Sequence, residues 1–328
     1  MRFDVAIVGA GATGNCTAWL LSKSGYRVAV FEKNKEIGNK LCGGLVSHRV
    51  IKYCKEAVVN EIRGAYLILP SGKEIFIGGD KVYAYVIDRK VFDTCLYENA
   101  MSEGARYFLN SMVEGKFPRL IGADGARSSI AKNFDGKISY INAVQGVAKG
   151  GDEEYVRVYF GKFAPGFFAW EIPAGNELRV GLGTNEKGLR KKFNKFKSII
   201  GREVKNERYA LIPYGLKRMA KENCAIVGDA AGHVKATSGG GLYAGLLASE
   251  MLAKNFCDFR SYERDFMRAY GNELRGCILL RKIFLRVGYE ALEKVVVDDG
   301  DMDYHWKFAK NFLVRHPFRA LKILKCLL

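Results

Sequence analysis

The sequence predicts an α/β fold, because its first residues alternate apolar strands with a helix in the order of a parallel sheet. An apolar run at 5–8 leads directly into a glycine-rich turn, and residues 15–23 follow with a helical pattern. A second apolar strand at 28–31 then ends at Glu32. The chain has 328 residues, of which 48% are hydrophobic, so it can bury a sizeable core and hold two structural units.

The turn between the first strand and the helix has the spacing of a Rossmann-type dinucleotide-binding site. Gly9 permits a tight turn, Gly11 lets backbone N–H groups approach a pyrophosphate, and Gly14 lets helix and strand pack closely. The N-terminus of the helix directs its partial positive charge at the phosphates. Glu32 is placed to accept hydrogen bonds from a ribose diol, which indicates FAD or NAD rather than NADP.

The chain is basic, with 52 Lys and Arg residues against 35 Asp and Glu residues and a net charge of +17. Such a field attracts a polyanion, which can be a nucleic acid, an anionic membrane or a phosphorylated substrate, and the plain alternative is a lysine-rich solvated surface. The sequence has no nucleic-acid-binding motif and no basic block interleaved with stacking aromatics, so we expect no nucleic acid partner.

The cysteines and histidines predict no metal site, because the eight cysteines form no C-x-x-C pair and the four histidines share no ligand spacing. Cysteines of this kind are typical of reduced thiols in an intracellular protein. No secretion signal is visible, and no stretch approaches the length of uncharged apolar residues that a membrane span needs. We therefore expect a cytoplasmic protein without a membrane span.

The end of the chain, residues 315–328, has basic residues at helical spacing among apolar ones. This pattern is that of a basic amphipathic helix lying on an anionic membrane, and equally that of an ordinary helix docked on its own domain. The first interpretation implies peripheral contact with the inner face of the membrane.

Three later motifs follow the glycine-rich turn in a fixed order. Arg89 starts a helical pattern, an Asp-Gly pair at 124–125 follows an apolar strand, and a Gly-Asp pair at 228–229 follows another. A glycine run at 239–241 then opens a further helix. Each motif alone has a plain explanation as a turn. Their order resembles the two-motif FAD fold of the aromatic hydroxylase and geranylgeranyl reductase superfamily.

That resemblance implies FAD as the cofactor. Asp229 would bind the ribityl chain, and Arg89 would lie near the pyrophosphate. The helix after the glycine run would direct its N-terminus at the flavin pyrimidine, where reduced flavin carries negative charge. The candidate cofactor-binding residues are Gly9, Gly11, Ala12, Thr13, Gly14, Glu32, Lys33, Cys42, Gly43, Arg89, Asp124, Gly125, Gly228, Asp229, Gly239, Gly240, Gly241 and Leu242.

An aromatic segment points to one branch of the superfamily. Residues 165–173, Pro-Gly-Phe-Phe-Ala-Trp-Glu-Ile-Pro, resemble the PxxYxWxFP signature of geranylgeranyl reductases, with Phe168 in place of the Tyr and Ile172 in place of the second Phe. The alternating aromatics predict a strand with Phe168 and Trp170 on one face. These two are the candidate substrate-binding residues, as the wall of an apolar cavity beside the flavin. The plain alternative is an ordinary core strand.

Two further segments bear on the same choice. Residues 41–47, Leu-Cys-Gly-Gly-Leu-Val-Ser, resemble the reductases' Cys-Gly segment, in which the cysteine lies beside the flavin. Residues 237–241 are similar to the D-P-x-T-G-G-G motif without its Asp-Pro portion. Residues 168–173 also resemble the W-x-W-x-I-P of flavin halogenases without the first Trp, but the Cys-Gly-Gly segment favours the reductases.

The resemblance implies an enzyme that saturates isolated double bonds of geranylgeranyl chains in isoprenoid diphosphates or isoprenoid ether phospholipids. An isolated alkene has no electron-withdrawing group, so its reduction needs hydride from reduced flavin N5 at one carbon and a proton at the other, in a site that excludes water. Cys42 is the candidate catalytic residue, as proton donor or as a positioning group near N5, and the plain alternative is a small buried thiol. The electron donor can be NAD(P)H, ferredoxin or another reduced carrier.

Two other functions stay open. An FAD-dependent monooxygenase or halogenase acting on an apolar substrate would use the same cofactor motifs. A non-catalytic prenyl-binding carrier would use the cavity without redox chemistry.

The resemblance also implies a division of the chain. A discontinuous FAD-binding domain would be built from 1–45, 85–130 and 220–255, and an antiparallel-sheet substrate-binding domain from 46–84 and 131–219. Residues 256–328 would form a C-terminal helical region. Only about 35 residues separate Arg89 from Asp124, where the family usually has a longer β-meander, so the chain looks like a trimmed member.

Overall fold

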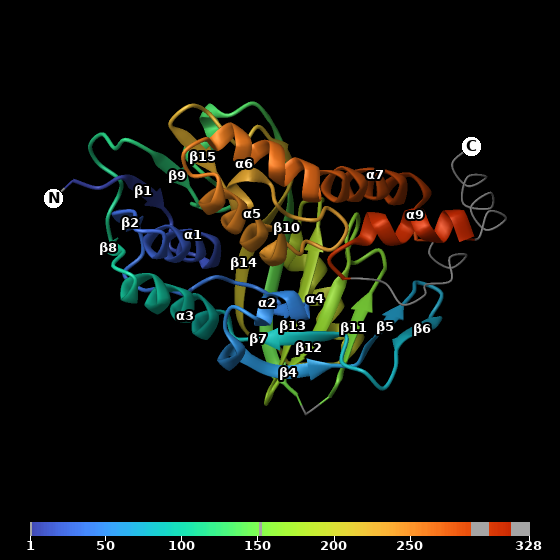
Figure 1. The fold of residues 1–328 in the computed structure, drawn as a ribbon. Helices are drawn as coiled ribbons and strands as arrows, with labels where there is room; N and C mark the ends of the chain where they lie inside the picture. The colour runs from blue at the N-terminus through green and yellow to red at the C-terminus, as the bar shows by residue number, and fades with distance from the viewer. Residues whose placement is uncertain (1, 151–152, 290–301, 316–328) are drawn as a thin grey trace.

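The computed structural model describes residues 2–150, 153–289 and 302–315, whose strands form three sheets (Figure 1). One sheet is parallel, and the other two are largely antiparallel. This arrangement confirms the predicted α/β class, with a Rossmann-like sheet, a separate antiparallel sheet and helices toward the C-terminus.

The parallel sheet has five strands in the order β15-β9-β1-β2-β8. Its strands are β1 (Val5–Val8), β2 (Val28–Glu32), β8 (Arg106–Leu109), β9 (Leu120–Gly122) and β15 (Cys224–Ile226). The first residues of β1 and β2 are fully buried, which explains why both strands have continuous apolar runs rather than an alternating pattern.

Three helices pack together beside this sheet, with α1 touching the other two. They are α1 (Ala12–Lys23), α3 (Arg89–Ser102) and α5 (Leu242–Lys254). Helix α1 begins at Ala12, earlier than predicted, because Gly11 already takes the extended conformation of an N-cap residue. Helix α3 begins after Asp88, whose carboxylate accepts the N–H groups of Lys90 and Val91.

The larger antiparallel sheet has seven strands in the order β14-β10-β13-β12-β11-β5-β6, and only its β5–β11 pair is parallel. Its strands are β5 (Gly64–Ile68), β6 (Glu74–Gly78), β10 (Gly136–Lys149), β11 (Tyr155–Tyr159), β12 (Ala169–Ala174), β13 (Glu177–Thr184) and β14 (Lys205–Lys217). Helix α4 (Leu189–Ile200) packs on β10 and β13 and buries Phe193 and Phe196.

The predicted aromatic strand is shorter than expected at its start. Strand β12 begins at Ala169, because the chain before it makes a turn at Gly166, whose φ is +73°. Phe167 N–H donates to the Ala164 carbonyl in this turn. Phe168 therefore lies just before the strand, and Trp170 lies within it.

The third sheet is small and has the order β3-β7-β4. Its strands are β3 (Leu45–Val46), β4 (Val58–Ile62) and β7 (Ala84–Ile87), and helices α2 (His48–Ile51) and η1 (Lys55–Ala57) connect β3 to β4. Between Arg89 and Asp124 the chain forms only α3, β8 and β9, as expected for a chain without the longer meander.

The helices toward the end of the chain lie along the upper side of the view in Figure 1 and at its right. They are α6 (Phe259–Phe266), the π-helix η4 (Met267–Gly271), α7 (Asn272–Val287) and α9 (His305–Arg315), and the remaining short helices are η2 (Ile130–Asn133) and η3 (Gly228–Ala231). The predicted amphipathic helix at 315–328 lies outside the described residues, apart from Arg315. Among the described helices, none combines the length and apolar character needed to cross a membrane.

Candidate cofactor and active site

The glycine turn, residues 9–14, has the close contacts that its sequence predicts. Gly9 has a φ of +101°, and a Cβ there would lie 2.5 Å from the Ala123 carbonyl oxygen. A Cβ on Gly14 would lie 2.0 Å from the Gly9 carbonyl oxygen. Gly11 differs, because a Cβ there would have no described atom within 4 Å. The turn is therefore tight on its inner side and open at Gly11, where the predicted pyrophosphate would approach.

Two helix N-termini lack a side-chain cap within the described residues. Helix α1 follows Gly11 and helix α5 follows Gly241, and in the described part of the chain neither helix has a side-chain cap or an acidic residue in its first turn. The first N–H groups of a helix have no partner within the helix and carry partial positive charge. An uncapped helix start is what the predicted roles toward a diphosphate and a reduced flavin would require.

The Glu32 carboxylate is buried at the end of β2 and braces the glycine turn. Its Oε2 accepts the Ala10 N–H at 2.8 Å, and its Oε1 accepts the Asn34 N–H at 2.9 Å. Lys33, also a candidate, is exposed beside it. Glu32 therefore holds the turn and the second strand in one arrangement.

The glycine turn meets the Gly-Asp motif, although the two are more than two hundred residues apart. Gly228 has a φ of +70°, and a Cβ on it would lie 2.9 Å from Thr13 Oγ1. Asp229 follows, and its Oδ1 would lie 3.5 Å from a Cβ on Gly241. The structure thus brings the first motif, the Gly-Asp pair and the start of α5 into one place.

Asp229 is paired with a cation that sequence analysis did not single out. Lys40 Nζ lies 3.0 Å from Asp229 Oδ2. Burial would raise the pKa of Asp229, but the charges of Lys40 and Arg89 hold that pKa below its ordinary value. Asp229 is therefore an ionised acceptor, as a group that binds ribityl hydroxyls should be.

Asp124 is satisfied by its own loop. Its Oδ1 accepts the Ser128 hydroxyl, and its Oδ2 accepts the N–H of Ser129 at 2.7 Å. Gly125 beside it has a φ of +79° and open space around a Cβ. The Asp-Gly pair thus shapes the loop after β9 next to Gly9.

Arg89 is held by a buried ion pair within α3. Its Nε and Nη2 each donate to an Asp93 carboxylate oxygen at 2.9 Å, and the two side chains are 11% and 1% exposed. Burial would lower the pKa of Arg89, but Asp93 and, next to it, Cys42 raise that pKa above its ordinary value. Arg89 is therefore a fixed cation that also faces Cys42.

The Cys42 loop, residues 42–44, lies against the antiparallel sheet and is held by two side chains that sequence analysis missed. Gln145 Nε2 on β10 donates to the Cys42 carbonyl at 3.1 Å. Arg179 Nη1 on β13 donates to the Gly43 carbonyl at 3.2 Å and to the Ile87 carbonyl at 2.9 Å. The two hydrogen bonds to the Cys42 loop each span more than a hundred residues, so no local pattern in the sequence predicts them.

The aromatic segment contacts the same loop. Trp170 Nε1 donates to Gln145 Oε1 at 3.0 Å, so Gln145 joins Trp170 to Cys42. A Cβ on Gly43 would lie 2.9 Å from Ile172 Cδ1. Phe168 meets Trp170 edge to face, with ring centroids 6.0 Å apart. The two candidate substrate residues are therefore neighbours beside the Cys42 loop, and both also pack in the core of this sheet.

The glycine run 239–241 touches the aromatic segment from the other side. A Cβ on Gly239 would lie 3.5 Å from the Phe167 ring. A Cβ on Gly240 would lie 3.4 Å from Cε of Lys235, a buried lysine whose ammonium donates to the Met302 carbonyl and lies 3.9 Å from Asp303. The positive charge of Lys235 beneath this run was also missed from the sequence.

His233, left out of the predicted catalytic set, is a buried structural residue. Its Nδ1 accepts the Gly228 N–H at 3.1 Å, and its ring stacks on Phe266 at a centroid distance of 4.2 Å. Burial lowers the pKa of His233 to about 3, so the ring is neutral at physiological pH. A neutral ring that braces the Gly228 turn has a positional role.

Comparisons with known proteins agree with this geometry. Residues 7–53, which include the glycine turn and Glu32, match a family model described as an NAD(P)-binding Rossmann-like domain. The chain is 29% identical over 317 residues to a digeranylgeranylglycerophospholipid reductase of Methanococcus vannielii, and the match covers 82% of this chain and 81% of that protein.

Two solved structures show the same fold. A geranylgeranyl bacteriochlorophyll reductase-like protein from Thermoplasma acidophilum has a TM-score of 0.81 and 19% identity, covering 99% of both chains. A myxobacterial FAD-dependent chondrochloren halogenase has a TM-score of 0.67 and 17% identity, covering 96% of this chain and 89% of that chain. Together the comparisons confirm the resemblance to the geranylgeranyl reductase family that the motifs indicate.

Proposed function

We propose that this protein is an FAD-dependent oxidoreductase that saturates isolated double bonds of geranylgeranyl chains in isoprenoid diphosphates or isoprenoid ether phospholipids. The observation that carries the proposal is the hydrogen-bonded path from Trp170 through Gln145 to Cys42. It joins the aromatic segment of the reductase signature to the Cys-Gly segment. Arg89 faces Cys42, and its charge also helps to hold the pKa of Asp229 below its ordinary value.

The residues present fit FAD. The open side of Gly11 and the uncapped start of α1 would hold the diphosphate, and Glu32 would hold the adenosine ribose. Asp229 would bind the ribityl chain, and the start of α5 after Gly241 would face the pyrimidine. Bound and reduced, FAD supplies a hydride from its N5.

Cys42 holds the proton that the second alkene carbon needs. Its sulfur accepts the Gly44 N–H at 3.4 Å, and its carbonyl accepts the Gln145 amide, so both ends of the residue are fixed. The Arg89 guanidinium lies beside the thiol and would help to position it. Cys42 is the proposed proton donor, and Gln145, Arg179 and Arg89 are the residues that position it.

The substrate side of the site is aromatic and apolar. Phe168 and Trp170 would contact the isoprenoid chain and exclude water from the double bond, which reduction of an isolated alkene requires. The net charge of +17 would attract the phosphate of the head group and an anionic membrane surface that contains it. The enzyme would also need a reduced electron donor to reduce its flavin. Its chain would divide into an FAD-binding domain and a substrate-binding domain.

A flavin halogenase or monooxygenase is the second candidate. The halogenase fold aligns over 96% of this chain, and residues 170–173 match the last part of the halogenase signature. The carrier alternative is less supported, because Glu32 accepts a backbone N–H of the glycine turn and Asp229 is paired with Lys40, an arrangement that would suit a bound cofactor.

The test compares product formation with and without oxygen. The FAD-loaded protein is given a chemical reductant and geranylgeranyl-bearing lipids, and the lipids are analysed by mass spectrometry. The proposal expects lipid that gains two hydrogen atoms per double bond under strict anaerobiosis. Oxygen consumption with an oxygenated or halogenated product, and no saturation without oxygen, would favour the second candidate. Protein that purifies without flavin and binds none would favour the carrier.

A further inference from the structure

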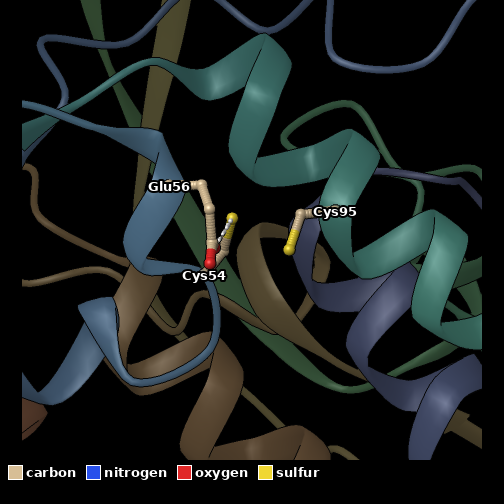
Figure 2. Close-up of side chains that lie close together, drawn as sticks. All are labelled: Cys54, Glu56 and Cys95. Atoms are coloured by element: carbon tan, nitrogen blue, oxygen red, sulfur yellow. Dashed lines mark hydrogen bonds between the residues drawn. The ribbon is translucent and has the colours of Figure 1, made fainter.

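We propose that Cys54, Glu56 and Cys95 form a zinc-binding site that ties helix α3 to the connection between β3 and β4. Figure 2 shows the three side chains close together, with Cys95 on α3 and the other two on the connecting segment. The two sulfurs and a Glu56 carboxylate oxygen all lie within 4.8 Å of one another. This proposal is independent of the flavin chemistry.

One pair of donors already has the spacing that zinc needs. Cys54 Sγ lies 3.6 Å from Glu56 Oε2. Zinc–sulfur and zinc–oxygen bonds of ordinary length in a tetrahedron place neighbouring donor atoms about 3.5–3.8 Å apart. Cys54 and Glu56 therefore already have the spacing of two zinc ligands, and Cys95 Sγ lies within 4.8 Å of both, so a small movement of the exposed Glu56 side chain would bring the donors around an ion.

A fourth donor is available at the same place. The Tyr53 carbonyl oxygen lies 3.8 Å from Cys95 Sγ. Either this oxygen or a water molecule would complete four-coordination. Two sulfur donors favour zinc over magnesium or calcium, which prefer oxygen alone.

The backbone explains why these residues meet. Cys54 is in an extended conformation directly before η1, with φ −166° and ψ 99°, which turns the chain so that Glu56 comes back beside it. Cys54 is 3% exposed, while Glu56 reaches solvent, so an ion can enter from the Glu56 side. The prediction of no metal site rested on ligand spacing along the chain, and Cys95 lies too far along the sequence to be part of any local motif.

A bound zinc ion would cross-link two elements that reach the active site from different directions. Helix α3 starts with Arg89, which faces Cys42, and only the short strand β3 separates the β3–β4 connection from the Cys42 loop. The ion would therefore stabilise the folded protein and hold α3 in place without touching substrate.

The experiment titrates zinc into the FAD-loaded full chain, after a thiol reductant and a chelator have removed metal and reduced the cysteines. Zinc is measured by competition with a chromophoric chelator, and cobalt substitution reports sulfur ligation by its charge-transfer absorption. We expect one zinc ion per chain at this site and a higher melting temperature with zinc than without.

The variants separate ligation from folding. Cys95→Ser and Glu56→Gln should each weaken zinc binding by about tenfold or more, since even loss of a residue that only supports a ligand costs 10–100-fold. Cys54→Ser should do the same, but its burial makes misfolding a risk, so the exposed Glu56→Gln variant decides the matter. Cys257→Ser and Glu61→Gln, an exposed thiol and an exposed carboxylate outside the cluster, should bind zinc as the unaltered protein does.

Zinc affinity that is unchanged in Cys95→Ser and Glu56→Gln would overturn the proposal. So would the absence of zinc binding in the reduced protein. A Cys54–Cys95 disulfide, found by peptide mass analysis in protein that binds no zinc after reduction, would replace the metal site with a thiol pair.

Discussion

The glycine turn and the Cys42 loop both depend on glycines, but they are held in different ways. In the glycine turn, backbone meets backbone: a Cβ on Gly14 would lie 2.0 Å from the Gly9 carbonyl oxygen. In the Cys42 loop, backbone carbonyls accept hydrogen bonds from Gln145 and Arg179, which stand on distant strands. The turn is thus fixed by contacts of the backbone with itself, while the loop is positioned by side chains that single substitutions can remove.

This difference predicts that cofactor binding and turnover can be separated. Substitutions at the turn should change flavin content, and substitutions around the loop should change turnover with flavin still bound. Variants at Cys42, in the glycine turn and at Gln145 test that separation, and the pH dependence of unfolding tests the role of His233 beside the Gly228 turn.

Cys42→Ala should reduce alkene saturation by about 10²–10⁴-fold, the usual effect of losing a positioned proton donor. Flavin should stay bound, because the Cys42 carbonyl still accepts the Gln145 amide. Turnover and flavin absorbance are measured on the same preparation. Near-normal turnover would remove Cys42 from the mechanism.

Gly14→Ala should destabilise the fold by about 3 kcal/mol and abolish flavin binding, because its Cβ would collide with backbone that cannot move aside. Gly11→Ala is the matched control, since its Cβ has open space and its φ is −79°. We expect Gly11→Ala to fold normally and to bind flavin more weakly, because the methyl group stands where the pyrophosphate would approach. Denaturant unfolding and flavin content measure both effects, and equal stability losses in the two variants would contradict this picture of the turn.

Acid should lower the free energy of unfolding through protonation of His233. The pKa of this ring is lowered to about 3 in the folded protein, against an ordinary value of 6.5. Between these two pH values the unfolded chain therefore binds a proton at His233 that the folded chain does not bind. The contribution of the neutral His233 ring to the free energy of unfolding is fully present above pH 6.5. It is lost as the pH falls toward 3, and the loss is about 2 kcal/mol at pH 5. Unfolding of His233→Gln should lack this part of the pH dependence, while the exposed His48→Gln should retain it.

Gln145→Leu should lower turnover about tenfold, with flavin content unchanged, because both the Cys42 carbonyl and the Trp170 N–H lose their partner. Asn60→Leu is the control: it removes two hydrogen bonds to backbone carbonyls, one of them on β12, without touching the Cys42 loop. If Asn60→Leu lowered turnover as much as Gln145→Leu, the effect would belong to the sheet as a whole.

The glycine turn was predictable because its determinants are local. Strand β1, the three glycines, helix α1 and Glu32 lie within the first 32 residues, and each residue type has one physical use at its position. The order of the later motifs also placed Asp229 and the start of α5 near the turn, which the contacts of Gly228 and Gly241 agree with.

The supports of the Cys42 loop were not predictable in the same way. Gln145 lies 103 residues from Cys42, and Arg179 lies 136 residues from Gly43. Neither belongs to a motif, because a side chain that reaches across two sheets leaves no periodic pattern in the sequence. Lys40 and Lys235 could not be singled out either, because their partners Asp229 and Asp303 lie far along the sequence and the chain has 52 basic residues.

Alkene reduction is tested by mixing the reduced FAD-loaded protein anaerobically with geranylgeranyl-bearing lipid, while flavin absorbance and product mass are followed together. The account predicts that the flavin reoxidises without oxygen and that each reoxidised flavin yields one saturated double bond. Flavin that stays reduced until oxygen enters would contradict it.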